Sequence, residues 1–241
     1  PQNLDDVALK NFWDVTVGGH LHANWPKITE RFDTIVVDEA QDFSPAWIAQ
    51  LDALLDEDGP RRMLMVADAA QDVFNRGFRA PTNEDGWTVC ELVSNCRNSL
   101  EIARLLRFFL NGVQAPNVIP EGSGVHFTEA SDEDVVAAVA TILRNDSNST
   151  KVIPPVAVIA PDHDLRDLLR TELGLGSWSD RHDKVICETP RRLKGTEFES
   201  VILVDPNGAL DDQALYISIS RAVGYLHIVG SEQLGRRFRL V

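Results

Sequence analysis

Cysteine is scarce in this sequence, and its scarcity excludes two classes of protein. The chain of 241 residues contains three cysteines, Cys90, Cys96 and Cys187, which are too few and too unevenly spaced for a disulfide framework or a zinc site. No stretch approaches the roughly 18 consecutive apolar residues of a membrane helix, and no charged-then-apolar leader opens the chain. We therefore expect a protein without a membrane partner that works in the reducing cytoplasm.

Positive charge is also in short supply. Lysine and arginine number 23 against 37 aspartates and glutamates, which gives a net charge of −14 and a pI near 4.8. The overall field therefore repels nucleic acid, whose binding is dominated by its phosphates. Any nucleic-acid site in this chain must be a local basic stripe.

Short apolar runs alternate with segments of helical periodicity, which predicts an α/β fold with mostly parallel sheets. The runs expected to form strands are residues 34–38, 63–68, 89–93, 124–128, 156–160, 184–188, 201–205 and 225–229. The segments expected to form helices are residues 45–55, 100–110, 132–143 and 165–173. Residues 75–87 are rich in Gly, Pro, Asn and Asp and predict a boundary between two domains, 1–80 and 81–241.

Polar side chains follow the first two expected strands. Asp38 and Glu39 come directly after the first strand, and Asp68 and Gln71 follow the second. Ligands of open α/β sheets bind beyond the carboxyl ends of the strands. A carboxylate there can hold Mg²⁺ on a nucleotide, and a second one can orient or deprotonate a water molecule. For an Asp-Glu pair alone, a polar turn at a strand end is the competing interpretation.

These residues belong to a series of five short motifs. The motifs are residues 38–42 (D-E-A-Q-D), 67–74 (A-D-A-A-Q-D-V-F), 95–99 (N-C-R-N-S), 189–198 (T-P-R-R-L-K-G-T-E-F) and 216–222 (Y-I-S-I-S-R-A). In this order they resemble motifs II to VI of the superfamily 1 helicases of the UvrD/Rep kind. The resemblance spans roughly residues 25–230.

The resemblance implies RecA-like parallel sheets with flanking helices, arranged as a partial first lobe and a complete second lobe. It implies ATP and Mg²⁺ as cofactors, with Asp38 holding the metal and Glu39 activating the water. Gln71 is expected to sense the γ-phosphate, and Arg97 and Arg221 to approach it from the second lobe. Such arginines stabilise the charge that develops during phosphoryl transfer.

The same resemblance implies a ribose contact and a DNA path. Glu197 is expected to accept a hydrogen bond from a ribose hydroxyl, with Gly195 in the same nucleotide-binding segment. Single-stranded DNA, or a junction with duplex DNA, is the expected partner. Its stacking and phosphate contacts are expected from Phe78, Arg79, Thr189, Arg191, Arg192 and Lys194. The competing interpretations are a buried loop aromatic for Phe78 and a solvated basic turn for residues 191–192.

The chain departs from the family pattern in one important way. It contains no G-x-x-x-x-G-K-[ST] loop, so the usual cradle for phosphates is absent. Two interpretations stay open. Either the loop lies in a missing N-terminal part of the same protein, before Pro1, or the chain is a non-catalytic, helicase-like module that binds nucleic acid or protein. In both cases we expect this polypeptide alone to hydrolyse ATP poorly or not at all. Arg191 replaces the family's histidine and Thr196 its leucine.

Overall fold

The structure is a computed structural model, and it describes residue 8 and residues 11–72, 74–92, 94–109, 124–144 and 154–241. The chain divides into two compact units, Pro1–Val89 and Cys90–Val241. The loop of residues 75–87 thus belongs to the first unit. No helix in the described ranges is long and apolar enough to cross a membrane.

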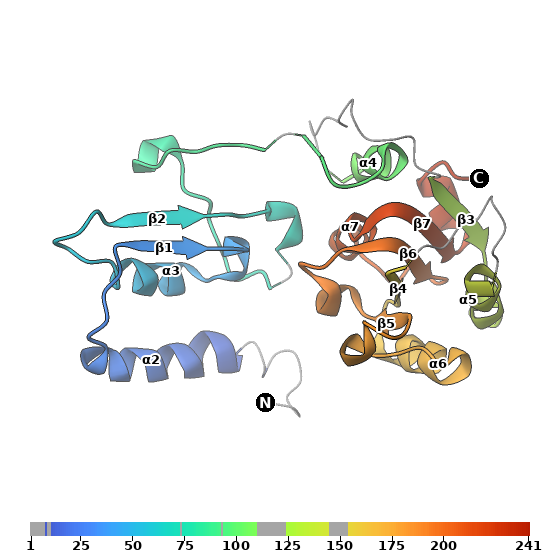
Figure 1. Ribbon diagram of the computed structural model, residues 1–241, viewed down its shortest axis with the longest axis horizontal. Coiled ribbons are helices and arrows are strands. Elements are labelled where there is room, and N and C mark those ends of the chain that lie inside the picture. The colour runs from blue at the N-terminus through green and yellow to red at the C-terminus, as the bar shows by residue number, and fades with distance from the viewer. Residues whose placement is uncertain (1–7, 9–10, 73, 93, 110–123, 145–153) are drawn as a thin grey trace. The chain divides into compact units, whose positions relative to one another are not determined.

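The first unit contains a two-stranded parallel sheet of β1 (Thr34–Val37) and β2 (Arg62–Met65) (Figure 1). Both strands arise from the apolar runs that predicted them. The predicted helix between them is α3 (Pro45–Asp52). Its first turn is stabilised by the Ser44 hydroxyl, which accepts a hydrogen bond from the backbone N–H of Trp47 at 3.3 Å.

Helical segments that the sequence did not predict precede this sheet. They are a π-helical turn (Phe12–Val17), helix α2 (Gly18–Asn24) and a 3₁₀ turn (Trp25–Lys27). Further 3₁₀ turns follow the two strands and the next loop, at Ala40–Asp42, Ala69–Gln71 and Asn83–Asp85. The turns after β1 and β2 place the first two sequence motifs directly beyond the carboxyl ends of the strands.

One face of the β1–β2 sheet is exposed and apolar. Val36, Leu64 and Val66 are 63%, 56% and 50% exposed, whereas Val37 on the other face is 3% exposed. Parallel sheets are ordinarily covered on both faces. The first unit therefore presents an uncovered apolar sheet surface.

The second unit is an α/β structure with a parallel sheet, as the sequence predicted. The sheet has five strands in the order β3-β7-β6-β4-β5. Its strands are β3 (Val125–Glu129), β4 (Val156–Ile159), β5 (Ile186–Glu188), β6 (Phe198–Asp205) and β7 (Ala222–Gly230). All four pairings between neighbouring strands are parallel.

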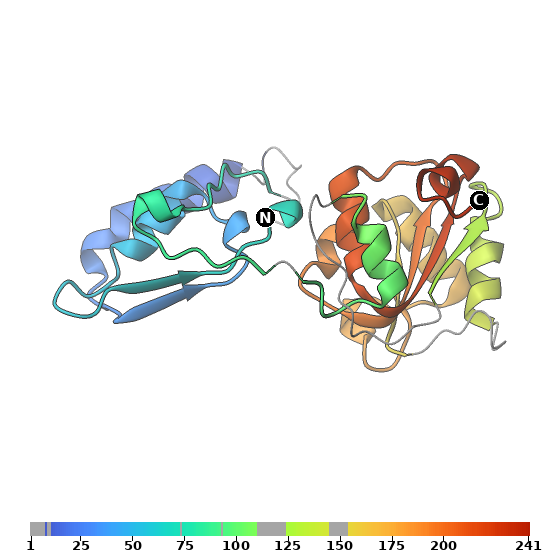
Figure 2. The same cartoon turned by 90° about the horizontal axis from the view of Figure 1, so that it is seen from above.

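Helices cover both faces of this sheet (Figure 2). They are α4 (Leu100–Leu106), α5 (Val135–Arg144), α6 (His163–Leu173), α7 (Asp212–Ser220) and α8 (Glu232–Arg237). Helices α5 and α6 pack on one face through a buried cluster that includes Val139, Leu169, Val158, Ile202 and Val229. Helices α4 and α7 contact each other and β7, on the opposite side of the sheet (Figure 2).

One expected strand is absent from the described residues, and two helices of the second unit were not predicted. The strand expected at residues 89–93 does not form in its described part, 89–92, because no described strand pairs with it and Leu92 is 93% exposed. Residue 93 lies outside the described residues. Helix α7 was not predicted, because it is buried on nearly every side and therefore lacks an amphipathic period. Helix α8 was also missed.

Candidate functional site

The first candidate site lies at the carboxyl end of β1. Asp38 is exposed, and its Oδ1 accepts a hydrogen bond from the backbone N–H of Glu39 at 2.9 Å. Glu39 is half-buried and has a left-handed backbone, with φ of 51°. Such a conformation costs a non-glycine residue of the order of 1–3 kcal/mol and is concentrated at functional sites. The local strain is consistent with a carboxylate that is held in place for a task.

Gln41 links the two predicted polar groups of this unit. It is 1% exposed, and its side-chain amide donates a hydrogen bond to the Glu39 carboxylate. Its Oε1 accepts from the backbone N–H of Asp68 at 2.9 Å. The Asp68 carboxylate in turn accepts from Gln71 Nε2 at 2.7 Å and from the backbone N–H of Ala70 at 3.0 Å. The residues that follow β1 and β2 therefore form one hydrogen-bonded network.

This network suits the chemistry of a nucleotide-bound metal. Among the described residues, no group of three or more Asp, Glu, His or Cys side chains could hold a metal ion. Mg²⁺ in nucleotide sites, however, usually needs only one or two carboxylates, because phosphates and water supply its other ligands. The exposed Asp38 carboxylate fits that requirement. Glu39, oriented by the Gln41 amide, is a carboxylate that can accept a proton.

Sequence reasoning gave no role to Arg76, which anchors the segment after the second motif. Its guanidinium donates to the carbonyl oxygen of Asp42 at 2.8 Å. It also lies over the rings of Trp47 and Phe74, at 4.8 and 4.5 Å from their centroids. These contacts join the two motif segments to α3. An arginine within two residues of a motif aromatic is the signal that could have found it.

The predicted DNA contacts of the first unit lie just beyond this anchor. Phe78 is half-buried and Arg79 is exposed. The exposed position of Arg79 suits a phosphate contact, and the partial exposure of Phe78 leaves part of its ring accessible for stacking. Val73, a further member of the motif at residues 67–74, lies outside the described residues.

In the second unit the structure pairs two predicted nucleotide contacts with each other. Arg97 Nε lies 2.6 Å from Glu197 Oε1, and the two side chains are 49% and 47% exposed. Asn95 Oδ1 accepts from the backbone N–H of Arg97 at 3.0 Å, which holds this arginine at the start of α4. Gly195 has φ of 77° and is exposed, a conformation that glycine adopts without strain. A γ-phosphate and a ribose would compete with this ion pair.

Arg221, the second predicted arginine of catalysis, is 1% exposed. Its guanidinium donates to the carbonyl oxygens of Ile217 and Thr196, both at 3.0 Å, and to Ser220 Oγ at 2.8 Å. It therefore ties the C-terminal end of α7 to the turn at residues 194–197. Arg221 is therefore a structural residue of the second unit.

Three of the four predicted DNA contacts of the second unit, Thr189, Arg191 and Arg192, line a cleft of about 470 Å³. Its lining residues are His163, Arg166, Arg170, Ser177, Glu188, Thr189, Arg191 and Arg192. The cleft lies beside α6, at the carboxyl end of β5. Four arginines and one glutamate line it, so its formal charge is 4 − 1 = +3 with neutral histidine. The cleft is therefore a local basic site in an otherwise acidic chain. Lys194 is not among the lining residues.

Carboxylates orient two of these arginines. Arg170 Nη2 lies 2.7 Å from Glu188 Oε1, and Arg170 Nε donates to the carbonyl oxygen of Cys187 at 2.9 Å. Arg166 donates to both oxygens of Asp167, at 2.8 and 3.0 Å. These bonds raise the pKa of Arg166 and lower the pKa of Asp167. Burial raises the pKa of the Cys187 thiol to about 12, so this cysteine is not a nucleophile at neutral pH.

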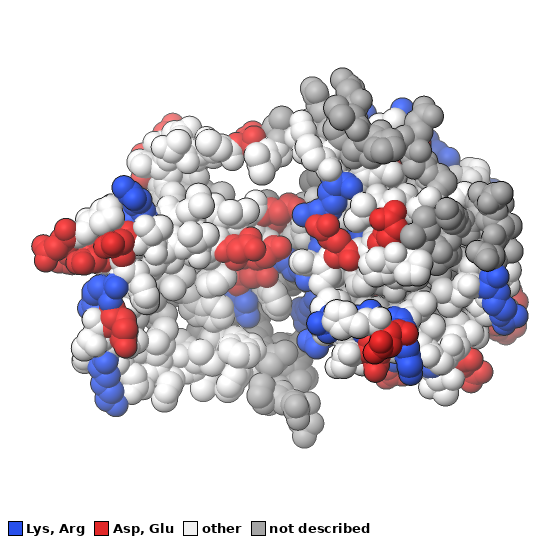
Figure 3. Space-filling model, viewed as in Figure 1, with Lys and Arg blue, Asp and Glu red and all other residues white. Residues whose placement is uncertain are grey.

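The arginines of α6 were missed from the sequence. His163, Arg166 and Arg170 are spaced three and four residues apart, which places them on one side of a helix. That spacing is the signal that could have found them. Figure 3 shows basic and acidic side chains next to each other over the unit that contains α6, in a chain whose overall charge is acidic.

Comparison with known proteins identifies the fold but no family. No protein-family model matches the chain, and no curated protein matches it. Among solved structures, the Arterivirus helicase nonstructural protein 10 matches with a TM-score of 0.53 and 17% identity, over 88% of this chain and 43% of that chain. Its complex with DNA matches with a TM-score of 0.52 and 16% identity, over 89% of this chain and 44% of that chain.

This chain has a helicase-like fold. The parallel sheet with flanking helices in the second unit is consistent with RecA-like helicase domains. The chain spans less than half the length of the viral helicases that it matches.

Proposed function

We propose that this chain is the C-terminal portion of a UvrD/Rep-like, ATP-dependent DNA helicase or translocase, active in the cytoplasm. It would couple ATP hydrolysis to movement along single-stranded DNA. The phosphate-binding loop would lie in an N-terminal part of the same protein. In this proposal Asp38 holds Mg²⁺, which neutralises phosphate charge, and Glu39 orients the attacking water and accepts its proton.

The hydrogen-bonded network beyond β1 and β2 carries this proposal. Gln41 connects the Glu39 carboxylate to the backbone of Asp68, and Asp68 holds Gln71. A water activated by Glu39 and a phosphate sensed by Gln71 would thus be coupled through a buried amide. A polar turn at a strand end needs no such connection between two separate motifs.

The remaining nucleotide contacts would come from the second unit. Arg97 and Arg221 would approach the γ-phosphate, and Glu197 would bind the ribose beside Gly195. Nucleotide binding would replace the Arg97–Glu197 ion pair with contacts to phosphate and ribose. Hydrolysis would then depend on closure of the two units, which is how a nucleotide cycle can drive stepping.

Two observations support a nucleic-acid partner and a missing segment. The cleft that holds Thr189, Arg191 and Arg192 carries a positive charge in an acidic chain, as a site for single-stranded DNA requires. Arg79, Phe78 and Lys194 would be further DNA contacts. The exposed apolar face of the β1–β2 sheet is the kind of surface that further strands and helices of the same lobe would cover.

Binding of labelled dT₁₂ to this chain, measured by fluorescence anisotropy between 50 and 300 mM NaCl, tests the DNA contacts. We expect binding that weakens with salt. The double substitution Arg191→Gln and Arg192→Gln should make the negative slope of log K against log[NaCl] shallower by about 1.4. ATP turnover by the chain alone should be close to background. Robust turnover, or binding that is indifferent to salt, would contradict the proposal.

The catalytic role of Glu39 is tested in a longer protein that carries the phosphate loop. Glu39→Gln should lower DNA-stimulated ATP hydrolysis by about 10²–10⁴-fold, the usual contribution of a general base. Glu57→Gln, which removes the same charge from an exposed position of the same unit, is the matched control. Equal activity of the two variants would rule out the role given to Glu39.

A non-catalytic nucleic-acid-binding module is the second candidate. The basic cleft favours it, because all the lining residues belong to the second unit and none is a predicted nucleotide contact. In that case DNA binding would not respond to Mg²⁺ and nucleotide, even in the longer protein.

A further inference from the structure

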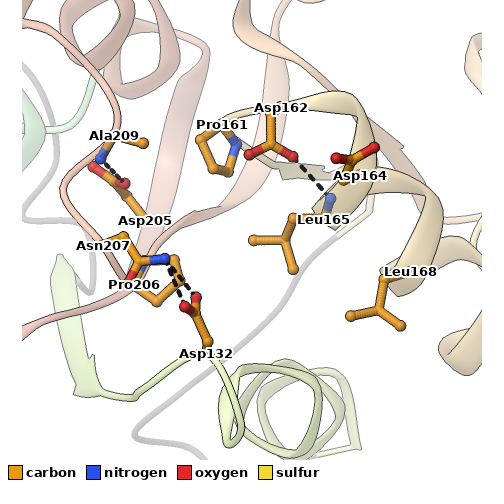
Figure 4. A pocket seen from close by; sticks show the side chains of 10 residues that line it. All are labelled: Asp132, Pro161, Asp162, Asp164, Leu165, Leu168, Asp205, Pro206, Asn207 and Ala209. Carbon is orange, nitrogen blue, oxygen red and sulfur yellow. Dashed lines mark hydrogen bonds between the residues drawn. The ribbon is translucent and has the colours of Figure 1, made fainter.

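Helix α6 separates two surfaces of opposite charge. His163, Arg166 and Arg170 line the basic cleft on one side. Asp164, Leu165 and Leu168 line a second pocket, of about 290 Å³, on the other (Figure 4). The spacing of the two sets along the helix places them on different faces. One helix thus forms a wall of both surfaces.

The second pocket is acidic. Its lining residues are Asp132, Pro161, Asp162, Asp164, Leu165, Leu168, Asp205, Pro206, Asn207 and Ala209. Four carboxylates and no lysine or arginine line it, so its formal charge is −4 with every carboxylate ionised.

Structural roles account for three of these carboxylates. Asp162 accepts from the backbone N–H of Leu165 at 2.8 Å and caps α6. Asp132 accepts from the side-chain amide of Asn207 at 2.8 and 2.7 Å (Figure 4). Asp205 accepts from the backbone N–H of Ala209 at 2.7 Å, and burial raises the pKa of Asp205.

The fourth carboxylate, Asp164, is exposed in the first turn of α6. An acidic side chain there favours the helix dipole. Asp164 lies where the two surfaces meet on α6: it lines the acidic pocket, and the preceding residue, His163, lines the basic cleft. Asp164 can therefore be changed without removing a partner of the loops around the pocket.

We propose that α6 is an electrostatic divider that confines a phosphodiester strand to the basic cleft. His163 and Arg166 contact the backbone phosphates from α6, opposite Arg191 and Arg192. The acidic pocket, with Asp164 at its border, repels the strand from the other side of the helix. This inference rests on the proposed DNA binding. It adds His163 and Arg166 of α6 as phosphate contacts, and the acidic pocket as a surface from which the strand is excluded.

The positions of the cleft's arginines support the divider. Arg166 is held by two bonds to Asp167, and Arg170 by Glu188, so each guanidinium is positioned before a strand arrives. A phosphate on the far side of α6 would meet four carboxylates and no compensating cation among the lining residues. The difference favours one track for the strand.

Single substitutions on the two faces of α6 test the inference with the dT₁₂ anisotropy assay. Arg166→Gln should weaken binding about fivefold at 50 mM NaCl. It should also make the negative slope of log K against log[NaCl] shallower by about 0.7, which corresponds to the loss of one phosphate contact on a single strand. Arg104→Gln, which removes an exposed arginine from helix α4, is the matched control and should leave both quantities unchanged.

Asp164→Asn should have the opposite effect. We expect dT₁₂ to bind about twofold more tightly at low salt. The gain should be lost above about 0.3 M NaCl, because salt screens the repulsion between the exposed Asp164 carboxylate and the phosphates. Glu172→Gln removes the same charge from an exposed position of the same helix that lines neither surface and should change affinity less. Thermal unfolding of each variant checks that α6 is intact.

The outcomes separate the inference from the proposed function. If Arg192→Gln weakens binding but Arg166→Gln does not, the divider is overturned and the DNA-binding proposal stands. Equal effects of Asp164→Asn and Glu172→Gln would also overturn it. If the wild-type chain shows no salt-dependent binding of dT₁₂, both are overturned.

Discussion

Replacing Arg221 by alanine should destabilise the second unit, whatever the substitution does to catalysis. The guanidinium is 1% exposed and donates three hydrogen bonds, to Ile217 O, Thr196 O and Ser220 Oγ. Alanine would leave these buried acceptors without that donor. It would also leave a cavity where the side chain packs between α7 and the turn before β6.

The size of the effect follows from these contacts. Hydrogen bonds to a charged group contribute about 1.5–3 kcal/mol each, and a buried acceptor left without a partner costs about 1–3 kcal/mol. Because such contributions are not additive within one network, we expect a loss of about 3–5 kcal/mol in the free energy of unfolding. For a unit of this size, that loss lowers the melting temperature by about 6–20 °C.

Urea and thermal unfolding, followed by circular dichroism, measure this loss. Arg97→Ala is the control, because Arg97 is 49% exposed and its ion pair with Glu197 is solvated. An ion pair of that kind contributes about 0–1 kcal/mol. Wild-type stability of Arg221→Ala would refute the structural role assigned here. If the role holds, reduced ATP turnover of an Arg221 variant indicates a catalytic arginine only at temperatures where the variant is folded.

Three further outcomes are expected. Gly230→Ala should cost about 1–3 kcal/mol in the free energy of unfolding, because its Cβ would lie 2.7 Å from a backbone oxygen; an unchanged urea midpoint would contradict the close packing of this strand. A thiol reagent at pH 8 should label exposed Cys90 and Cys96 rapidly and buried Cys187 slowly, as counted by mass spectrometry. Backbone and hydroxyl hydrogen bonds lower the pKa of Asp180, so its stabilising effect is present above its unfolded pKa and is lost as the pH falls through the folded value. The difference in melting temperature between wild type and the Asn variant should therefore shrink below about pH 4, and a constant difference would contradict it.

Much of the fold was predictable because its strands are buried on both faces. Strands β4, β6 and β7 arise from largely apolar runs. Such runs are typical of strands in a parallel sheet that is covered on both faces. The segment at residues 89–93 has a similar texture. None of the described strands pairs with residues 89–92, and pairing partners are not visible in local composition.

The polar residues of the candidate site in the first unit were also apparent from the sequence. Asp38, Glu39 and Gln71 follow strands, and the structure places them in or beside one network. The bridge between them, Gln41, could not be assigned a role, because its partner lies 27 residues away along the chain. Its contribution depends on two strands being neighbours.

By itself the sequence determined the approximate positions of most strands, which polar residues follow them, and that a basic site had to be local. These properties depend on short-range patterns of side-chain type, which the chain carries whether or not it is folded. Tertiary structure alone decided that Arg221 is buried, that Arg97 pairs with Glu197, and that α6 has a basic and an acidic side. Each of these depends on which distant segments the parallel sheet brings side by side.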